Sequence, residues 1–351
     1  LVAQAGIQGI EFRDEVQTAN RAVRALKRRG VETIVVLLHE GGIQSGTFSD
    51  CVGISGPVVD IAKNLDAEID LVVTGHTHQP YVCDIPDPRG RDRKVTSASS
   101  FGRVVTETVL PINRRTGDVR RPAVTATNHK VLRTNPDSTQ TGILAKWKAE
   151  ADPIANRVVG SAATDINRAA NRDGEGPLAN LIADAQLAAT SAAANGGAQI
   201  AFMNPGGVRA DLEAGDITYG EAFTVQPFGN TLVTMDLTGA QIEQLLEQQG
   251  RSTSRDSQLI FGVSRGFTYT WRDTAGDHVD PATIRLNGAP LDPAATYRVV
   301  TNSFLADGGD SFTVFREGTN RVGGGDDLEA LLAYLGANSP VSPPEDRITG
   351  V

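Results

Sequence analysis

The amino-acid sequence predicts two domains that mix helices and strands, an α/β domain followed by an α+β domain. The 351 residues suffice for two domains of ordinary size, and a hydrophobic content of 40% is ample for two cores. In the first part of the chain, short β-branched runs alternate with helical segments, which is typical of parallel strands joined by helices. The second part has an alanine-rich helix and strands that run into glycine-rich turns.

The first domain is expected to begin with an amphipathic helix over residues 14–29, whose apolar face carries Val16, Ala19, Val23 and Leu26. Residues 31–38 and 69–74 are short and apolar, as expected of strands buried on both faces of a sheet. A helix over residues 57–65 lies between them, so the two strands are expected to be parallel neighbours. Residues 95–109 alternate more between polar and apolar side chains and are expected to form edge strands.

Residues 138–155 are expected to form a linker helix, which gives the boundaries 1–137, 138–155 and 156–351. Its large apolar residues are spaced for one helical face: Ile143, Leu144, Trp147 and Ile154. Pro153 is expected to kink or end this helix, because proline removes a backbone hydrogen bond. The alternative is that the helix caps the core of the first domain.

The second domain is expected to contain a long helix over residues 177–194, since Pro177 suits a first helical turn. Strands are expected at residues 199–203, 231–237 and 298–301. Thr238 and Gln241 have the spacing of a capping box for the helix that follows. The glycine-rich residues 323–327 are expected to form a mobile surface turn.

Three histidines follow the two predicted strands of the first domain. His39 comes directly after residues 31–38, and His76 and His78 come after residues 69–74. Ligand sites in open α/β sheets lie at the carboxyl ends of such strands, and imidazole is the commonest protein ligand of metals. The three side chains could therefore supply about half of a two-metal site. The alternative is that they are solvent-facing histidines of two loops.

The tripeptide L-H-E at His39 and the tetrapeptide G-H-T-H at His76 resemble the C-terminal half of a calcineurin-like metallophosphoesterase domain. The resemblance implies an incomplete four-layer α/β/β/α fold with His39, His76 and His78 as metal ligands. The motifs D-x-H and G-N-H-D or G-N-H-E, which complete the site in that superfamily, do not occur in the sequence. The catalytic histidine–aspartate pair is therefore expected upstream of Leu1, and this chain alone is expected to have negligible phosphatase activity.

Three segments of the second part occur in a specific order: N-P-G-G-V-R from Asn204, P-F-G around Phe228, and S-F-L-A-D-G-G-D around Phe304. They resemble the C-terminal domain of the 5'-nucleotidases, which follows a metallophosphoesterase domain in that family. The resemblance implies metal-dependent hydrolysis of nucleoside 5'-monophosphates. UDP-sugar hydrolysis or cleavage of 2',3'-cyclic nucleotides on the same scaffold remains an alternative. A catalytically inactive nucleoside-binding module is another.

Arginines are the candidate phosphate ligands of the second domain. Arg209 follows two glycines, Gly206 and Gly207, so the backbone can approach a ligand and the guanidinium can fork onto a phosphate. Arg172 precedes the alanine-rich helix and could add a second cationic contact. The alternative for Arg172 is a solvated loop residue.

Two phenylalanines, Phe228 and Phe304, lie in turn-rich surroundings and could hold a planar base between their rings. Core packing is the alternative for each of them, although the matching pair clamps the nucleobase in the family. Asp310 could accept hydrogen bonds from ribose hydroxyls, and Asn204 could bind the base or the sugar. These last two roles are implied mainly by the resemblance.

The resemblance also implies two divalent metal ions, with zinc, manganese, cobalt and calcium not distinguished, and an extracellular, periplasmic or cell-surface location. An exported protein favours a disulfide between Cys51 and Cys83, the two cysteines of the chain, although two buried thiols are the alternative. The net charge is −9, so a nucleic-acid polymer is not an expected partner. The expected partner is a nucleotide or nucleoside substrate.

Overall fold

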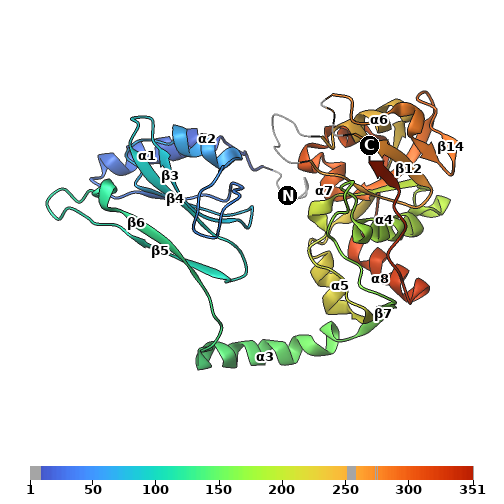
Figure 1. The fold of residues 1–351 in the computed structure, drawn as a ribbon, viewed down its shortest axis with the longest axis horizontal. Helices are drawn as coiled ribbons and strands as arrows, with labels where there is room; N and C mark the ends of the chain where they lie inside the picture. The colour runs from blue at the N-terminus through green and yellow to red at the C-terminus, as the bar shows by residue number, and fades with distance from the viewer. Residues whose placement is uncertain (1–8, 251–257, 273, 275, 351) are drawn as a thin grey trace. The chain divides into compact units, whose positions relative to one another are not determined.

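The computed structural model describes residues 9–250, 258–272, 274 and 276–350. The chain divides into two compact units, one formed by Gly9–Ser138 and the other by the described residues from 139 onward (Figure 1). Both units mix helices and strands, as the sequence predicts.

A four-stranded sheet forms the centre of the first unit. Its strands follow the order β1-β2-β4-β3: Val35–Leu37, Leu71–Thr74, Asp92–Ala98 and Pro80–Pro86. β1, β2 and β4 are parallel, and β3 returns antiparallel to β4. The predicted parallel pairing of the first two strands is therefore confirmed, with Val35 opposite Leu71.

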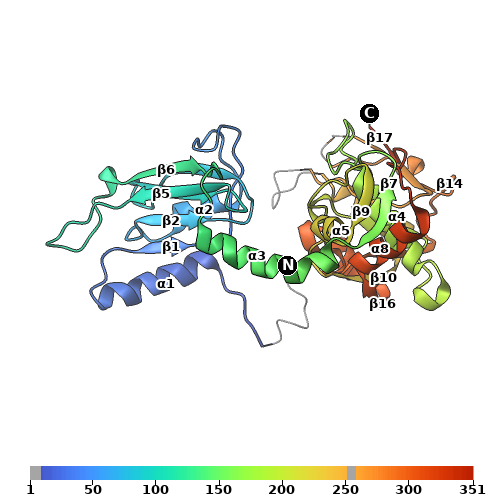
Figure 2. The same cartoon turned by 90° about the horizontal axis from the view of Figure 1, so that it is seen from below.

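The first unit has a layer of helices, the central sheet and a second small sheet. α1, Glu15–Arg28, packs on α2, Pro57–Asn64, and α2 packs on β3. On the other side β5, Val104–Val109, and β6, Thr125–Lys130, pair with each other and contact β3 and β4 (Figures 1 and 2). This helix–sheet–sheet arrangement forms three layers.

Two expectations about these strands are wrong. β1 is not buried on both faces. It is an edge strand, which pairs with β2 alone among the described strands. Leu37 is accordingly 80% exposed. β4 is not an edge strand but lies between β2 and β3, and its Thr96 and Ser97 are buried. Their small polar side chains produced the alternation that suggested an edge.

α3, Ser138–Ala155, has no buried residue. It continues for two residues beyond Pro153, so the proline does not end the helix. The apolar residues that the sequence places on one face are all exposed: Ile143, Leu144, Trp147 and Ile154. The role of α3 as a linker stays a prediction.

A five-stranded sheet organises the second unit, in the order β11-β8-β15-β10-β16. These strands are Gly262–Val263, Ile200–Met203, Thr296–Asn302, Thr231–Thr238 and Thr319–Asp326. Side chains of β8 alternate between two cores, with Ile200 and Phe202 in one and Ala201 and Met203 in the other. The sheet is therefore buried on both faces. α4, Pro177–Thr190, contacts β8 and β15 on one face.

Smaller elements complete the second unit. A second sheet has the order β14-β13-β12-β17, with strands Ala289–Pro290, Arg285–Leu286, Phe267–Trp271 and Ile348–Gly350. β7 and β9, Val158–Ala162 and Gly215–Thr218, form a pair. The remaining α-helices are α5, α6, α7 and α8: Tyr219–Val225, Gly239–Glu247, Ser303–Ala306 and Asp327–Asn338. The predicted capping box of Thr238 and Gln241 at the start of α6 is confirmed.

The glycine-rich residues 323–327 do not form a surface turn. Gly323, Gly324 and Gly325 belong to β16, which pairs with β10 through two register shifts. A Cβ atom on Gly324 would lie 3.3 Å from the carbonyl oxygen of Leu232, so the absent side chain permits the close approach of the strands. Asp327 is buried at the first residue of α8. The predicted helix over residues 177–194 is also too long, because α4 ends at Thr190.

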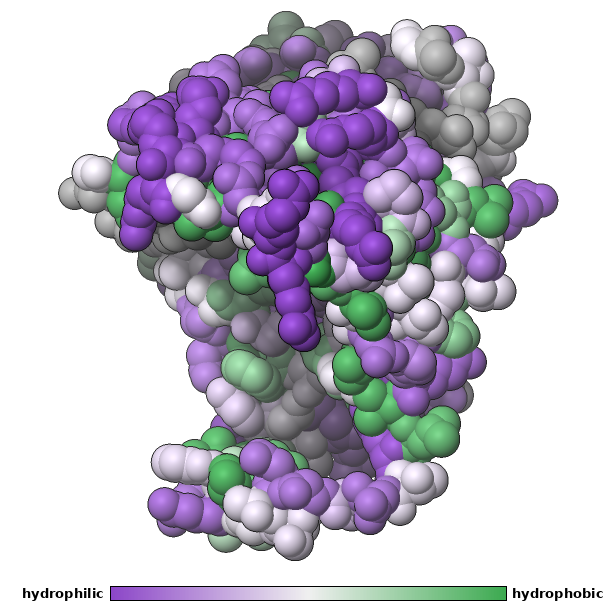
Figure 3. All heavy atoms as spheres, turned by 90° about the vertical axis from the view of Figure 1, so that its left-hand side faces the viewer, coloured by the Kyte–Doolittle hydropathy of each residue, from purple (hydrophilic) through white to green (hydrophobic). Residues whose placement is uncertain are grey.

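Hydrophilic side chains cover most of the face of the first unit that Figure 3 turns toward the viewer, with hydrophobic residues scattered among them. Within the described part of the chain, no helix is both long enough and apolar enough to cross a membrane.

Candidate substrate-binding site

Strand order brings three separate motifs to one edge of the five-stranded sheet. β8 and β15 are parallel neighbours, with Phe202 opposite Thr301, so the segments that follow them leave the sheet side by side. β10 is antiparallel to β15, with Leu232 opposite Asn302, so the loop that precedes β10 reaches the same edge. Residues 204–209, 226–230 and 303–310 therefore converge, although they lie far apart in the sequence.

Asn204 forms the centre of a buried hydrogen-bond chain. Its Nδ2 donates to Oδ2 of Asp310 at 2.8 Å, and its Oδ1 accepts from Nδ2 of Asn302 at 3.0 Å. Asn302 in turn caps α7, because its Oδ1 accepts from the backbone N–H of Leu305 at 2.9 Å. Asn204 is only 3% exposed. Asn204 thus holds the Asp310 carboxylate in place, and sequence reasoning missed Asn302 although it precedes the S-F-L-A motif directly.

The turn after β8 fixes Gly207 and Arg209. A Cβ atom on Gly207 would lie 2.5 Å from Cε of Met203 and 2.9 Å from Oδ1 of Asn204, so a side chain there would displace one of these groups. The backbone N–H of Arg209 donates to the carbonyl of Val225 at 2.9 Å, and its Nη1 donates to the carbonyl of Gly206 at 3.1 Å. The guanidinium carbon lies 5.6 Å from the ring centroid of Phe228. Arg209 and Phe228 therefore form a cation–π contact at the sheet edge.

The two phenylalanines differ in their surroundings. Phe228 is 51% exposed. Phe304 is half-buried, and its ring packs so closely on Gly309 that a Cβ atom there would lie 2.4 Å from Cζ. Phe304 also packs against one of the two cores of this unit. The structure brings both rings to the same edge, whereas the clamp of a base between them stays a prediction.

Hydrogen bonds tie the loop that carries Phe228 to its neighbours. Oδ2 of Asp327 accepts from Nε2 of Gln226 at 3.4 Å and from Nδ2 of Asn230 at 3.2 Å. Oδ1 of Asn230 accepts from the hydroxyl of Ser303 at 3.3 Å. Burial raises the pKa of Asp327 to about 6. Sequence reasoning missed these polar residues, because their contacts depend on the tertiary fold.

Arg172 lies on an exposed loop before α4. Its side chain is 88% exposed and pairs with the neighbouring Asp173, with Nε 3.3 Å from Oδ1. Among the described residues no hydrogen bond or ion pair joins Arg172 to Asn204, Arg209 or Asp310. Its role as a phosphate ligand stays a prediction.

The three predicted metal-binding histidines, His39, His76 and His78, follow neighbouring parallel strands of the first unit. The rings of His39 and His76 lie edge to face, with centroids 5.3 Å apart. The ring of His78 instead contacts Phe101, with centroids 5.5 Å apart. His76 and His78 have φ angles of 68° and 58°, a left-handed backbone that is uncommon for residues other than glycine. The described residues contain no group of three or more His, Cys, Asp or Glu side chains that could hold a metal ion.

A disulfide joins Cys51 to Cys83, with Cα atoms 5.1 Å apart, as the sequence analysis expects. Cys83 is a buried residue of β3, the strand that follows the segment of His76 and His78. The bond therefore links the loop before α2 to the sheet next to the histidine segment.

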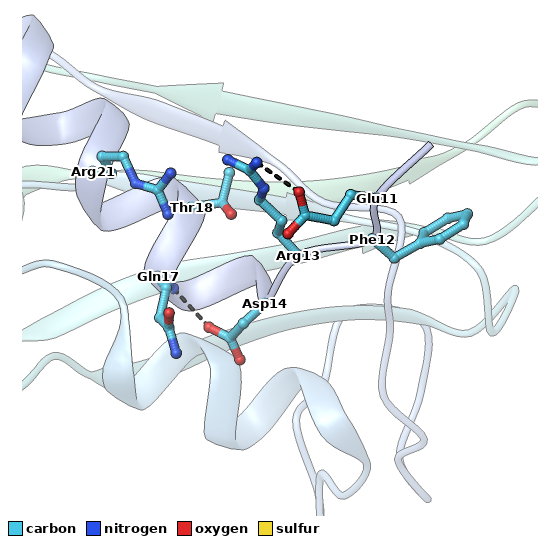
Figure 4. A pocket seen from close by; sticks show the side chains of 7 residues that line it. All are labelled: Glu11, Phe12, Arg13, Asp14, Gln17, Thr18 and Arg21. Carbon is cyan, nitrogen blue, oxygen red and sulfur yellow. Dashed lines mark hydrogen bonds and ion pairs between the residues drawn. The ribbon is translucent and has the colours of Figure 1, made fainter. Parts of the chain in front are cut away.

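Figure 4 shows a shallow polar pocket at the start of α1, with a volume of about 340 Å³. Two of its charged groups pair with each other, since Nη2 of Arg13 lies 2.7 Å from Oε2 of Glu11. Asp14 accepts a hydrogen bond from the backbone N–H of Gln17 and caps the helix. None of the predicted site residues lines this pocket.

Comparisons with known proteins agree with the motifs. Residues 158–317 match the family model described as the 5'-nucleotidase, C-terminal domain. The chain is 32% identical to Endonuclease YhcR of Bacillus subtilis and 32% identical to Cell wall protein Lmo0130 of Listeria monocytogenes. Each match covers 95% of this chain but only 26% and 44% of those proteins. The chain thus spans less than half the length of these curated relatives.

The chain covers a larger share of one solved structure than of these relatives. The 5'-nucleotidase precursor from Thermus thermophilus is 30% identical, and the similarity covers 97% of this chain and 68% of that one, with a TM-score of 0.75. The fold of the chain is therefore that of the 5'-nucleotidases, which combine a metallophosphoesterase fold with a C-terminal domain. The chain therefore belongs to the 5'-nucleotidase family.

Proposed function

We propose that the chain is part of a hydrolase that releases phosphate from nucleoside 5'-monophosphates, and that its second unit binds the nucleoside. The observation that carries this proposal is the convergence of Asn204, Arg209, Phe228 and Asp310 at one sheet edge. A cation, a carboxylate and exposed aromatic surface are the three kinds of group that a nucleotide requires, for its phosphate, ribose and base.

Each part of the nucleotide has a candidate ligand. The base would stack between Phe228 and Phe304, since an aromatic ring that is half exposed can still accept a planar partner. The Asp310 carboxylate, held by the amide of Asn204, would accept hydrogen bonds from the ribose hydroxyls. Arg209 would bind the phosphate, with Arg172 as a second contact. Gly207 would contribute indirectly, because its missing side chain leaves space for Asn204 beside it.

A metal would bind at the histidines that follow β1 and β2. His39 and His76 are the residues that fit best, because their rings already lie edge to face beyond the ends of these parallel strands, with His78 two residues away. Imidazole suits zinc, whereas calcium and manganese prefer oxygen ligands. With further ligands beside these histidines, two divalent cations would stabilise negative charge on the phosphoryl oxygens and lower the pKa of a bound water.

The residues of this chain would orient the substrate for that chemistry. Arg209 would neutralise charge on the phosphate, and the two phenylalanine rings would exclude water from the faces of the base. Because Arg209 contacts Phe228, the phosphate and the base would be held in a fixed relation to each other. Precise orientation of this kind lowers the entropic part of a reaction barrier.

Calorimetric titration tests the proposal. We expect the 351-residue chain to bind AMP more tightly than adenosine, and adenosine more tightly than ribose. The first difference measures the phosphate contact and the second measures the base contact. Equal affinity for AMP and inorganic phosphate, with no binding of adenosine, would show that the second unit does not bind the nucleoside.

Other phosphoester substrates on the same scaffold are UDP-sugars and 2',3'-cyclic nucleotides. A titration with UDP-glucose and with 2',3'-cyclic AMP beside AMP ranks these ligands. The relative named as an endonuclease matches this chain over only 26% of its length, so that name gives no reason to expect a polymer substrate here.

We also propose that the protein is exported, to the periplasm, the cell surface or the medium. The Cys51–Cys83 disulfide supports this location, because such bonds persist in oxidising compartments. The similarity to a protein named as a cell wall protein supports it too.

A further inference from the structure

We propose that Asp327 is a positioning residue for base recognition, which holds both ends of the loop that carries Phe228. This inference rests on the proposed function, because it gives Asp327 its role through the base that Phe228 would stack on.

The loop cannot be fixed by its own apolar packing. Phe228 is 51% exposed, and Gly229 beside it is exposed as well. A segment with so little buried apolar surface gains little from the hydrophobic effect. Its position must therefore come largely from polar contacts at its ends.

Asp327 supplies contacts to both of those ends. Its Oδ2 accepts from Nε2 of Gln226 on one side of the loop and from Nδ2 of Asn230 on the other, at 3.4 and 3.2 Å. Its backbone N–H also donates to the carbonyl of Asn230 at 2.9 Å. Asp327 and Gln226 are buried, at 2% and 1% exposure. One buried residue therefore spans the three residues that present the ring.

The Asp327 side chain does not cap α8. That task belongs to Asp326, whose Oδ1 accepts from the backbone N–H groups of Leu328 and Glu329 at 2.9 and 3.1 Å. The two adjacent aspartates thus have separate roles, one in the helix and one toward the loop. This separation provides a matched control.

A buried carboxyl group in this place costs stability. Oδ1 of Asp327 has no hydrogen-bond partner among the described residues, and burial raises the pKa of the group to about 6. A buried carboxylate oxygen without a hydrogen-bond partner lowers the free energy of unfolding. What the group adds is therefore the position of the loop.

The hydrogen bonds of Asp327 also connect, through Asn230, to the helix that carries the second ring. Oδ1 of Asn230 accepts from the hydroxyl of Ser303, which also accepts from the backbone N–H of Thr231 at 3.3 Å. Ser303 directly precedes Phe304 in α7. The chain from Asp327 through Asn230 to Ser303 thus joins the loop of one ring to the helix of the other, and would set the spacing between them.

The experiment measures adenosine affinity of the full chain and of four single variants. We expect Asp327→Ala to weaken adenosine binding about tenfold, since it removes a charged acceptor from two amides, and Asp327→Asn, which keeps an acceptor, to restore most of it. Asp326→Ala should lower Tm by a few degrees through its lost cap but leave adenosine affinity unchanged. Asn230→Ala removes the same contact from the loop side and gives the answer if Asp327→Ala does not fold.

A double variant separates positioning from general destabilisation. In a Phe228→Ala background, Asp327→Ala should have no further effect on adenosine affinity, because the ring it positions is gone. Independent, additive losses would overturn the inference, as would normal adenosine binding by both Asp327→Ala and Asn230→Ala while Phe228→Ala binds weakly. If Phe228→Ala itself binds adenosine as well as the wild type does, the proposed base clamp fails, and this inference fails with it.

Discussion

The guanidinium carbon of Arg209 lies 5.6 Å from the ring centroid of Phe228. The proposed phosphate ligand and one of the proposed base ligands therefore touch each other in the chain without substrate. Their contributions to binding should not be independent, because a change in one residue alters the surroundings of the other.

Arg209→Ala should weaken AMP binding by about tenfold or more, since a charge-assisted phosphate contact is lost. Adenosine binding should also fall, by about two- to fivefold, because the cation–π contact to Phe228 disappears with the guanidinium. Arg172→Ala is the control: its side chain is exposed, no cation–π contact joins it to either ring among the described residues, and the change should affect AMP alone. Calorimetric titration of both variants with both ligands checks this. Unchanged AMP affinity of Arg209→Ala would contradict the phosphate role.

Phe228→Ala and Phe304→Ala should each weaken adenosine binding by about 1–3 kcal/mol, and the double variant should lose less than the sum. Only Phe304→Ala should also lower the free energy of unfolding, because Phe304 packs against the core and Phe228 is 51% exposed. Phe223→Ala is the matched control, since Phe223 is 47% exposed in the same unit and stacks on Tyr219. If the Phe304 variant loses stability but binds adenosine normally, its ring is a core residue alone.

The topology that joins these residues could not be predicted from the sequence. The helix at residues 15–28, the capping box at Thr238 and the strands at residues 71–74 and 231–238 follow from local patterns, and the structure contains them. A local pattern does not reveal which strands are neighbours. The side chains of β1 are apolar and therefore suggested a buried strand, but its place at the end of the sheet leaves Leu37 80% exposed.

The same limit explains the site. Arg209, Phe228 and Phe304 were identifiable because they lie in recognisable motifs, whereas Asn302 and Asp327 have roles that only their tertiary partners define. The glycines before Asp327 suggested a surface turn, since local flexibility is what glycine signals in a sequence. Pairing of that segment with β10 removes the flexibility and buries the aspartate.

Stability of the second unit should depend on pH through Asp327. Burial raises its pKa from 3.8 to about 6, so the folded chain binds more protons than the unfolded chain between these values, and stability falls as the pH rises through that window. Relative to Asp327→Asn, the free energy of unfolding of the wild type should fall by up to about 3 kcal/mol across the window. The pKa of Asp70 is also raised to about 6, but both proteins retain Asp70, so its effect cancels. The measurement is urea unfolding of both proteins at several pH values. If their free energies of unfolding change by the same amount across this pH range, the assignment to Asp327 is wrong.

Reduction of the disulfide should lower the stability of the first unit. Its cysteines are 32 positions apart, so in the chain-entropy model the bond contributes about 3–4 kcal/mol. The double variant Cys51→Ser, Cys83→Ser should unfold at the same denaturant concentration as the reduced wild type. Mass spectrometry without reductant should find the two peptides linked. Two freely alkylatable thiols in the native protein would count against both the bond and the proposed export.

The purified chain should hydrolyse AMP no faster than a double variant His39→Ala, His76→Ala. The described residues bring only two of the three predicted histidine ligands together, which is too few for a two-metal site. The assay is phosphate release with zinc, manganese or cobalt added. Hydrolysis by the wild type that the double variant lacks would show that the chain holds a complete site.

We propose that Phe228 and Phe304 bind a nucleobase while Asp310 binds the ribose. A crystal structure of the chain with adenosine would show whether they do. We expect the base between the two phenylalanine rings and the ribose hydroxyls within hydrogen-bond distance of the Asp310 carboxylate, with Asn204 still donating to that carboxylate. Adenosine bound elsewhere on the second unit, with Arg209 still over an uncovered Phe228 ring, would contradict the account.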